Sequence, residues 1–118
     1  MVLSVKITGL SKVRSYLKRK NIEIERLLEK GVNDSGEFLK TEIKASISGQ
    51  RPEKRSVNTG QFLNSIEANK GVVSSNVPQA AFMEYGSSKV PERRHFRNSA
   101  DRSKHKIRDI LGEALKKL

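Results

Sequence analysis

The residues best suited to acid–base chemistry are few and scattered along the sequence. The only two histidines are His95, in a basic stretch, and His105, in a predicted helix. A small ribonuclease combines histidine with Lys or Arg around a phosphate, so a ribonuclease or toxin-like enzyme that uses either histidine is one hypothesis. Glu84 beside Tyr85 offers a general base, but no second carboxylate or histidine stands near it. We prefer to interpret Glu84 as an ordinary polar residue before the helix-ending Gly86.

The composition argues against several other kinds of site. None of the 118 residues is cysteine, which excludes disulfides, thiolate metal sites and thiol nucleophiles. Phosphate-binding glycine loops, dinucleotide fingerprints, zinc-protease helices and EF-hand loops are all absent from the sequence. We therefore expect no catalytic residue, no metal and no cofactor. No apolar run approaches the roughly 20 residues of a membrane span, so we expect no membrane partner.

The positive charge of the chain is unevenly distributed. Lys and Arg number 24 against 13 Asp and Glu, which gives a formal net charge of +11. Residues 1–20 and 89–118 each carry +6, and the residues between them are nearly neutral. Such a charge favours a polyanionic partner, so a stand-alone nucleic-acid-binding module is a second hypothesis. No recognisable nucleic-acid recognition motif accompanies the charge.

Two basic segments are the candidates for contact with DNA or with an acidic partner. They contribute Lys18, Arg19, Lys20, Lys89, Arg93, Arg94 and Arg97. In the second segment the cations surround Phe96, and a nucleic-acid contact uses both charges and a stacking ring. The interpretation that we prefer is that Phe96 anchors the segment to a hydrophobic surface.

Hydrophobic periodicity predicts the elements of the first half of the chain. Apolar residues alternate from Leu3 to Ile7, which predicts a strand, and a short helix is expected from Ser11. From Ile24 to Ile47 apolar residues recur at helical spacing, which predicts one long helix. Residues 48–61 are rich in glycine and charge, and we expect a mobile loop that orders only on assembly.

The second half predicts a hairpin and a terminal helix. Strands are expected at 65–69 and at 72–77, joined by a turn at Gly71 and ended by Pro78. A short helical or turn segment at 80–85, an extended basic arm at 87–97 and an amphipathic helix from Asn98 or Ser99 follow. The fold class is therefore α+β, a single domain over residues 1–118 in which a small antiparallel sheet packs against the long helix and the C-terminal helix. Apolar residues are only 35% of the chain, so we expect a thin core that partner subunits complete.

Four segments in this order carry a family resemblance. They are the leading Val5, Ile7, Gly9 and Leu10; VNTGQFLNSI at 57–66; AAFMEYGS at 80–87; and VPERRHFRNSA at 90–100. Together they resemble the tail-completion or head–tail joining proteins of tailed bacteriophages, also called minor tail proteins of the Z type. The sequence departs from the family pattern at Asn58, Ala80 and Arg94, where an acidic residue, an aromatic and a proline are common.

The resemblance implies a non-enzymatic virion structural protein, made in the host cytoplasm and located in the tail or neck. It implies a homo-oligomeric ring, expected to be a hexamer, between the tail tube or tail terminator and the head-completion or connector proteins, with non-specific contact to passing DNA as a further expectation. The residues that would shape the fold or the subunit contact are Thr59, Gly60, Phe82, Glu84, Tyr85, Gly86, Pro91 and Phe96. On this basis we expect Phe96 at the tip of an arm that reaches a neighbouring subunit, so that its loss impairs assembly more than folding.

Overall fold

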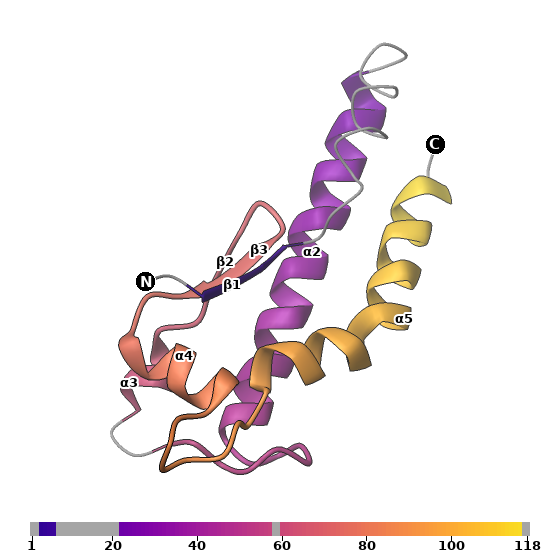
Figure 1. Ribbon diagram of the computed structural model, residues 1–118. Helices are drawn as coiled ribbons and strands as arrows, with labels where there is room; N and C mark the ends of the chain where they lie inside the picture. The colour runs from indigo at the N-terminus through magenta and orange to yellow at the C-terminus, as the bar shows by residue number, and fades with distance from the viewer. Residues whose placement is uncertain (1–2, 7–21, 58–59, 117–118) are drawn as a thin grey trace.

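The computed structural model describes residues 3–6, 22–57 and 60–116 (Figure 1). The predicted helix from Ser11 and the candidate residues Lys18, Arg19, Lys20 and Thr59 lie outside this part of the chain. The predicted α+β class is confirmed. The elements in chain order are β1 (Leu3–Lys6), α2 (Ile22–Ile47), α3 (Gln61–Asn64), β2 (Glu67–Asn69), β3 (Val72–Ser75), α4 (Pro78–Tyr85) and α5 (His95–Lys116).

The three strands form an antiparallel sheet in the order β1-β3-β2. Val73 of the central strand is fully buried and pairs with Val5 on one side and Ala68 on the other. The predicted hairpin turn is confirmed, with positive φ at Lys70 (50°) and Gly71 (81°), as type I′ turns require. The predicted extent of this strand was wrong: β3 ends at Ser75, two residues before the predicted end at residue 77, and Pro78 is the first residue of α4. Its fixed φ suits the first position of a helix.

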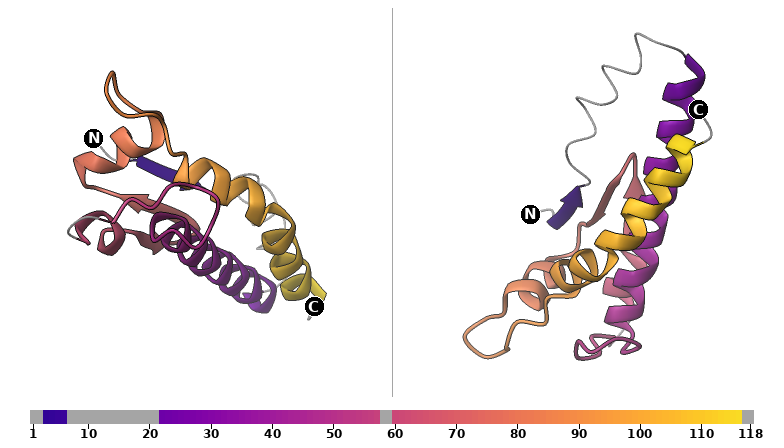
Figure 2. Two further views of the ribbon diagram at one scale, coloured as in Figure 1. Left: turned by 90° about the horizontal axis from the view of Figure 1, so that it is seen from below. Right: turned by 90° about the vertical axis from the view of Figure 1, so that its right-hand side faces the viewer.

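The long helix α2 and the bent helix α5 run side by side in opposite directions (Figures 1 and 2). Small residues line their contact. A Cβ built at Gly31 would lie 3.0 Å from the Cβ of Ala114, and Ser35 of α2 and Ser103 of α5 are at most 1% exposed. Small side chains let the two backbones approach closely, which orients α5 along α2. No helix of the described ranges is both long enough and apolar enough to cross a membrane.

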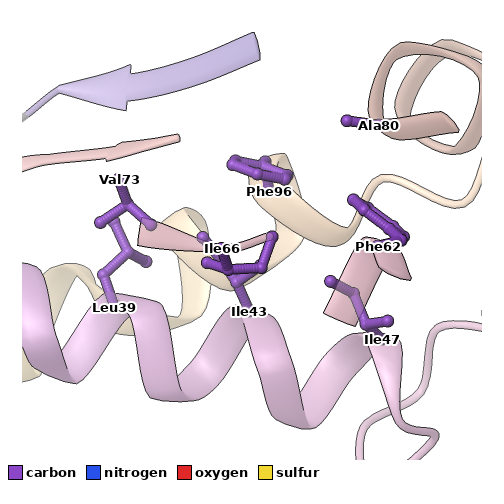
Figure 3. Close-up of a cluster of buried hydrophobic side chains, with 8 residues drawn as sticks. All are labelled: Leu39, Ile43, Ile47, Phe62, Ile66, Val73, Ala80 and Phe96. Carbon is purple, nitrogen blue, oxygen red and sulfur yellow. The ribbon is translucent and has the colours of Figure 1, made fainter. Parts of the chain in front are cut away.

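One apolar cluster joins the helices to the sheet (Figure 3). Three residues of α2 point into it, and α3, β3 and α5 each contribute to the opposite side. Its buried members are Leu39, Ile43, Ile47, Phe62, Ile66, Val73, Ala80 and Phe96. Helix α3, which brings Phe62 into the cluster, was not predicted. Its glycine cap, Gly60, has φ of 83°, in line with the expected role of that residue.

The helix contact yields a comparison between two glycines. At Gly112 of α5 a Cβ meets nothing within 4 Å, so Gly112→Ala should raise the free energy of unfolding by about 1 kcal/mol through helix propensity. At Gly31 the same change meets Ala114, so we expect a smaller gain or a loss. Urea unfolding of both variants measures the difference. Equal gains would contradict a close α2–α5 contact at Gly31.

Candidate functional site around helix α4

Helix α4 carries two exposed aromatic side chains on one face. Phe82 is 57% exposed and Tyr85 is 62% exposed, and their spacing of three residues places them side by side. The residues on the opposite side of the helix, Ala80 and Glu84, are buried. Exposed large apolar side chains that lie together mark an interaction surface more often than isolated ones do. We name Phe82 and Tyr85 the aromatic face of α4.

Glu84 holds this helix against α5. Its two carboxylate oxygens accept hydrogen bonds, both of 2.8 Å, from the backbone N–H groups of Phe96 and Arg97. These N–H groups belong to the first turn of α5, where no intrahelical acceptor exists and where a negative charge is favoured. The preferred interpretation of Glu84 as an ordinary polar residue was therefore wrong, because the side chain is 5% exposed and caps a helix.

The cap also explains why α5 begins earlier than predicted. The helix begins at His95, ahead of the predicted Asn98 or Ser99, and the first intrahelical bond runs from Asn98 N to Arg94 O. Arg94 itself has φ of 53°. The predicted arm over 87–97 thus ends at residue 94. We name residues 86–94 the α4–α5 arm.

The ends of this arm are held together, and it returns to α4 (Figure 2). Arg93 N donates to the Met83 carbonyl at 2.7 Å, and Ser87 N donates to the Val90 carbonyl at 2.8 Å. Gly86 begins the arm with φ of 80°, and a Cβ there would lie 2.8 Å from the Glu92 nitrogen. Gly86 thus closes α4 as predicted, and no side chain fits at its position. Pro91 is exposed in the arm.

Phe96 does not lie at the tip of the arm. It is 2% exposed and lies within the chain's own core, between α2 and α4 (Figure 3). The expectation that Phe96 reaches a neighbouring subunit was therefore wrong, and the anchoring interpretation holds for its own chain. The cause is the early start of α5, which turns residue 96 inward.

His95 is at the centre of a buried polar network behind the arm. Its ring nitrogens Nδ1 and Nε2 each lie 2.7 Å from a serine hydroxyl, those of Ser46 and Ser56 respectively. The Ser46 hydroxyl donates to Glu53 at 2.6 Å, so its oxygen accepts from Nδ1–H and leaves Nε2 to accept from Ser56. Arg93 in turn donates to the Ser56 hydroxyl at 2.8 Å. These bonds join α2, the loop after it, the arm and α5.

The network holds His95 neutral. Burial lowers the pKa of His95 to about 4, against the favourable charge of Glu53 and with the help of Arg93 and Arg102. The side chain is fully buried and both ring nitrogens are engaged. A ribonuclease built on His95 would need that ring at the surface. His105 is exposed, roughly 15 Å further along α5.

Glu53 ties the loop of residues 48–57 to α5. Both of its oxygens accept from the Arg102 guanidinium, at 2.6 and 2.7 Å, and Asn98 donates a third bond at 3.2 Å. The bonds from Arg102, Ser46 and Asn98 lower the pKa of Glu53 to about 2 against the effect of burial. Arg51 makes a second bidentate pair with Glu42 of α2, at 2.9 Å. These bonds hold the described residues 48–57 against α2 and α5, and the expectation that the 48–61 segment orders on assembly stays a prediction.

The candidate basic residues therefore divide into two groups. Arg93 and Arg94 are engaged within the chain, Arg93 with Ser56 and Arg94 with Glu92. Lys89 and Arg97 are exposed and form no salt bridge with a described carboxylate. Among the described residues, no group of three or more His, Cys, Asp and Glu side chains has the arrangement of a metal site.

Comparisons with known proteins add no relative. No protein-family model, no curated protein and no solved structure matches this chain. The motifs of the sequence and the geometry of α4, the arm and α5 are therefore the basis for a functional proposal.

The cap yields a prediction with a matched control. Glu84→Gln replaces one acceptor oxygen by an NH₂ group facing the α5 N–H groups, so the free energy of unfolding should fall by about 1–2 kcal/mol. Glu92→Gln removes an equal charge from a solvent-exposed pair with Arg94 and should change the free energy of unfolding much less. Chemical denaturation measures both. Equal effects would contradict the capping role.

The His95 network yields a pH dependence. Because the folded pKa of about 4 lies below the ordinary value of 6.5, the unfolded chain binds a proton first as the pH falls. Stability is therefore full above pH 6.5 and falls by roughly 2 kcal/mol by pH 4.5. Glu53 does not contribute in this window, because its stabilisation is lost only as pH falls from 4.5 towards 2.

His95→Gln should remove most of this slope between pH 6.5 and 4.5, whereas His105→Gln, at an exposed position, should retain it. Urea midpoints across the pH series measure the slope. An unchanged slope in His95→Gln would show that His95 is not the titrating group.

Proposed function

We propose that the chain is a structural subunit of a tailed-bacteriophage virion that assembles as a homo-oligomeric ring at the neck, between the tail tube and the head connector. The observation that carries the proposal is the aromatic face of α4, Phe82 and Tyr85, on a helix whose other side is fixed. Burying two such rings stabilises an interface by several kcal/mol, because each ring removes a large apolar area from water.

An apolar groove extends the aromatic face towards the sheet. It has a volume of about 280 Å³ and is lined by β1, the residues before α4 and α4 itself. Phe82 belongs both to the aromatic face and to this groove, and Leu3, Val77 and Ala81 lie along it. A neighbouring subunit that covers the aromatic face therefore also finds a recess for an apolar side chain. This continuity supports a protein contact there.

The shape of the subunit supports a ring. The molecule is elongated, with extents of 53 × 26 × 21 Å. The aromatic face belongs to α4, which lies near the end of the molecule where α5 begins (Figure 1). A contact between this face and a different surface of the next copy is head-to-tail, and repeated head-to-tail contacts with a closing rotation form rings.

The motif residues divide between fold and contact on this account. Glu84, Gly86 and Phe96 fix the junction of α4, the arm and α5, and Gly60 fixes the start of α3. Phe82 and Tyr85 make no comparable contribution to the core, which leaves them to contact the neighbouring subunit. The resemblance to tail-completion proteins supports the location in the neck.

The proposal predicts that assembly and folding separate. The double variant Phe82→Ser/Tyr85→Ser should lose the oligomer and still fold, because both side chains are exposed in the single subunit. At a low concentration, where the unchanged chain is also monomeric, the two chains should have nearly the same unfolding midpoint. Leu115→Ser also removes an exposed apolar side chain, 40% exposed at the far end of α5, and should still assemble. Native mass measurement and thermal unfolding follow the two properties.

A chain that stays monomeric at high concentration and is absent from purified virions would contradict the proposed function. So would an oligomer whose mass is insensitive to the double variant, because that would place the subunit contact elsewhere.

A further inference from the structure

We propose that the end of the molecule formed by the loop of residues 48–57, the α4–α5 arm and the first turn of α5 binds the phosphate backbone of double-stranded DNA without sequence preference. We name this surface the basic end. The two loops lie at the same end of the molecule, beyond the last turn of α2 (Figure 1). That this DNA is the molecule passing through a neck ring depends on the proposed function.

Four cations of the basic end are exposed and form no salt bridge within the described ranges, although the Arg55 guanidinium also donates to the Val57 carbonyl at 3.2 Å. Each has no carboxylate within salt-bridge distance among the described residues. They come from the loop (Lys54, Arg55), the arm (Lys89) and α5 (Arg97). Arg93 links two of these segments, because its guanidinium donates to the Arg55 carbonyl at 3.2 Å and to the Ser56 hydroxyl.

The carboxylates of the same region are already engaged. Glu42 pairs with Arg51, Glu53 with Arg102 and Glu92 with Arg94, while Glu84 accepts from two backbone N–H groups. Each of these acids already has a hydrogen-bond partner, so the four cations leave the region with a net positive charge. Arg97 lies near enough to Glu92 for its charge to help lower the pKa of that carboxyl. The basic end therefore presents an uncompensated positive potential to solvent.

The absence of apolar anchors favours DNA over an acidic protein. The large apolar side chains that are exposed in the described residues are Phe82, Tyr85 and Leu115, and none belongs to the loop, the arm or the first turn of α5. A protein interface requires an apolar core, whereas phosphate contacts require only positioned cations and fix no sequence. The basic end offers positioned cations without an apolar core, as phosphate contacts require.

The test measures binding to a short random-sequence DNA duplex as a function of salt. Four phosphate contacts give a slope of log K against log salt of about −3.6. The test variant replaces Lys54, Arg55, Lys89 and Arg97 by Gln. The matched control replaces Lys30, Lys40, Lys106 and Arg108 by Gln, which removes the same charge from α2 and the C-terminal half of α5.

We expect the unchanged chain and the control to keep the slope, and the test variant to lose most of it. An equal loss in both variants would overturn the proposal, because the attraction would then follow net charge alone. No binding at low salt would overturn it, as would tighter binding to the single strand or to polyglutamate than to the duplex.

Oligomer mass and thermal unfolding, read on the same samples, separate this inference from the proposed function. A ring that does not bind the duplex would contradict the inference alone. A monomer that binds the duplex with the expected slope would contradict the ring alone.

Discussion

The carboxylate of Glu84 is the interaction on which the functional surface depends. It lies in the last turn of α4 and accepts from the N–H groups of Phe96 and Arg97 in the first turn of α5, twelve and thirteen residues later. A buried carboxylate is costly unless its oxygens are satisfied, so this contact fixes both helices at once. It turns Phe96 into the core and leaves Phe82 and Tyr85 on the outer side of α4.

The second constraint is the polar character of the interior. Five serines, at positions 35, 46, 75, 99 and 103, are at most 1% exposed. The hydroxyl of Ser46 is hydrogen-bonded to His95, and that of Ser75 to the Ser65 hydroxyl. Small serines allow α2 and α5 to approach closely, and hydrogen bonds to His95 and Glu53 satisfy polar groups that the low apolar content leaves inside. Buried polar groups thus fill part of an interior for which only 35% of the residues are apolar. Among the buried serines, the hydroxyls of Ser35 and Ser103 have no hydrogen-bond partner in the described part of the chain.

Local patterns predicted much of the fold. The periodicity from Ile24 to Ile47 predicted α2, and Gly71 and Gly86 predicted the hairpin turn and the end of α4. The start of α5 was missed because its cap comes from a glutamate outside the helix, which no spacing rule detects. The buried state of His95 was missed for the same reason, since its partners Ser46 and Ser56 lie 49 and 39 residues away.

The candidate site was predicted only in part. The sequence indicated that Phe82, Glu84, Tyr85 and Gly86 matter together, but it did not separate the residues that hold the fold from those that face outward. The alternation of exposure along one short helix made that distinction. It depends on contacts with α5 and the core, and α4 alone does not encode it.

Electron cryo-microscopy of the assembled protein tests the central claim most directly. The account predicts a closed ring in which Phe82 and Tyr85 are buried against the neighbouring subunit, while Glu84 keeps its bonds to the first turn of α5 within its own chain. A ring in which the aromatic face of α4 remains in contact with solvent would contradict the account.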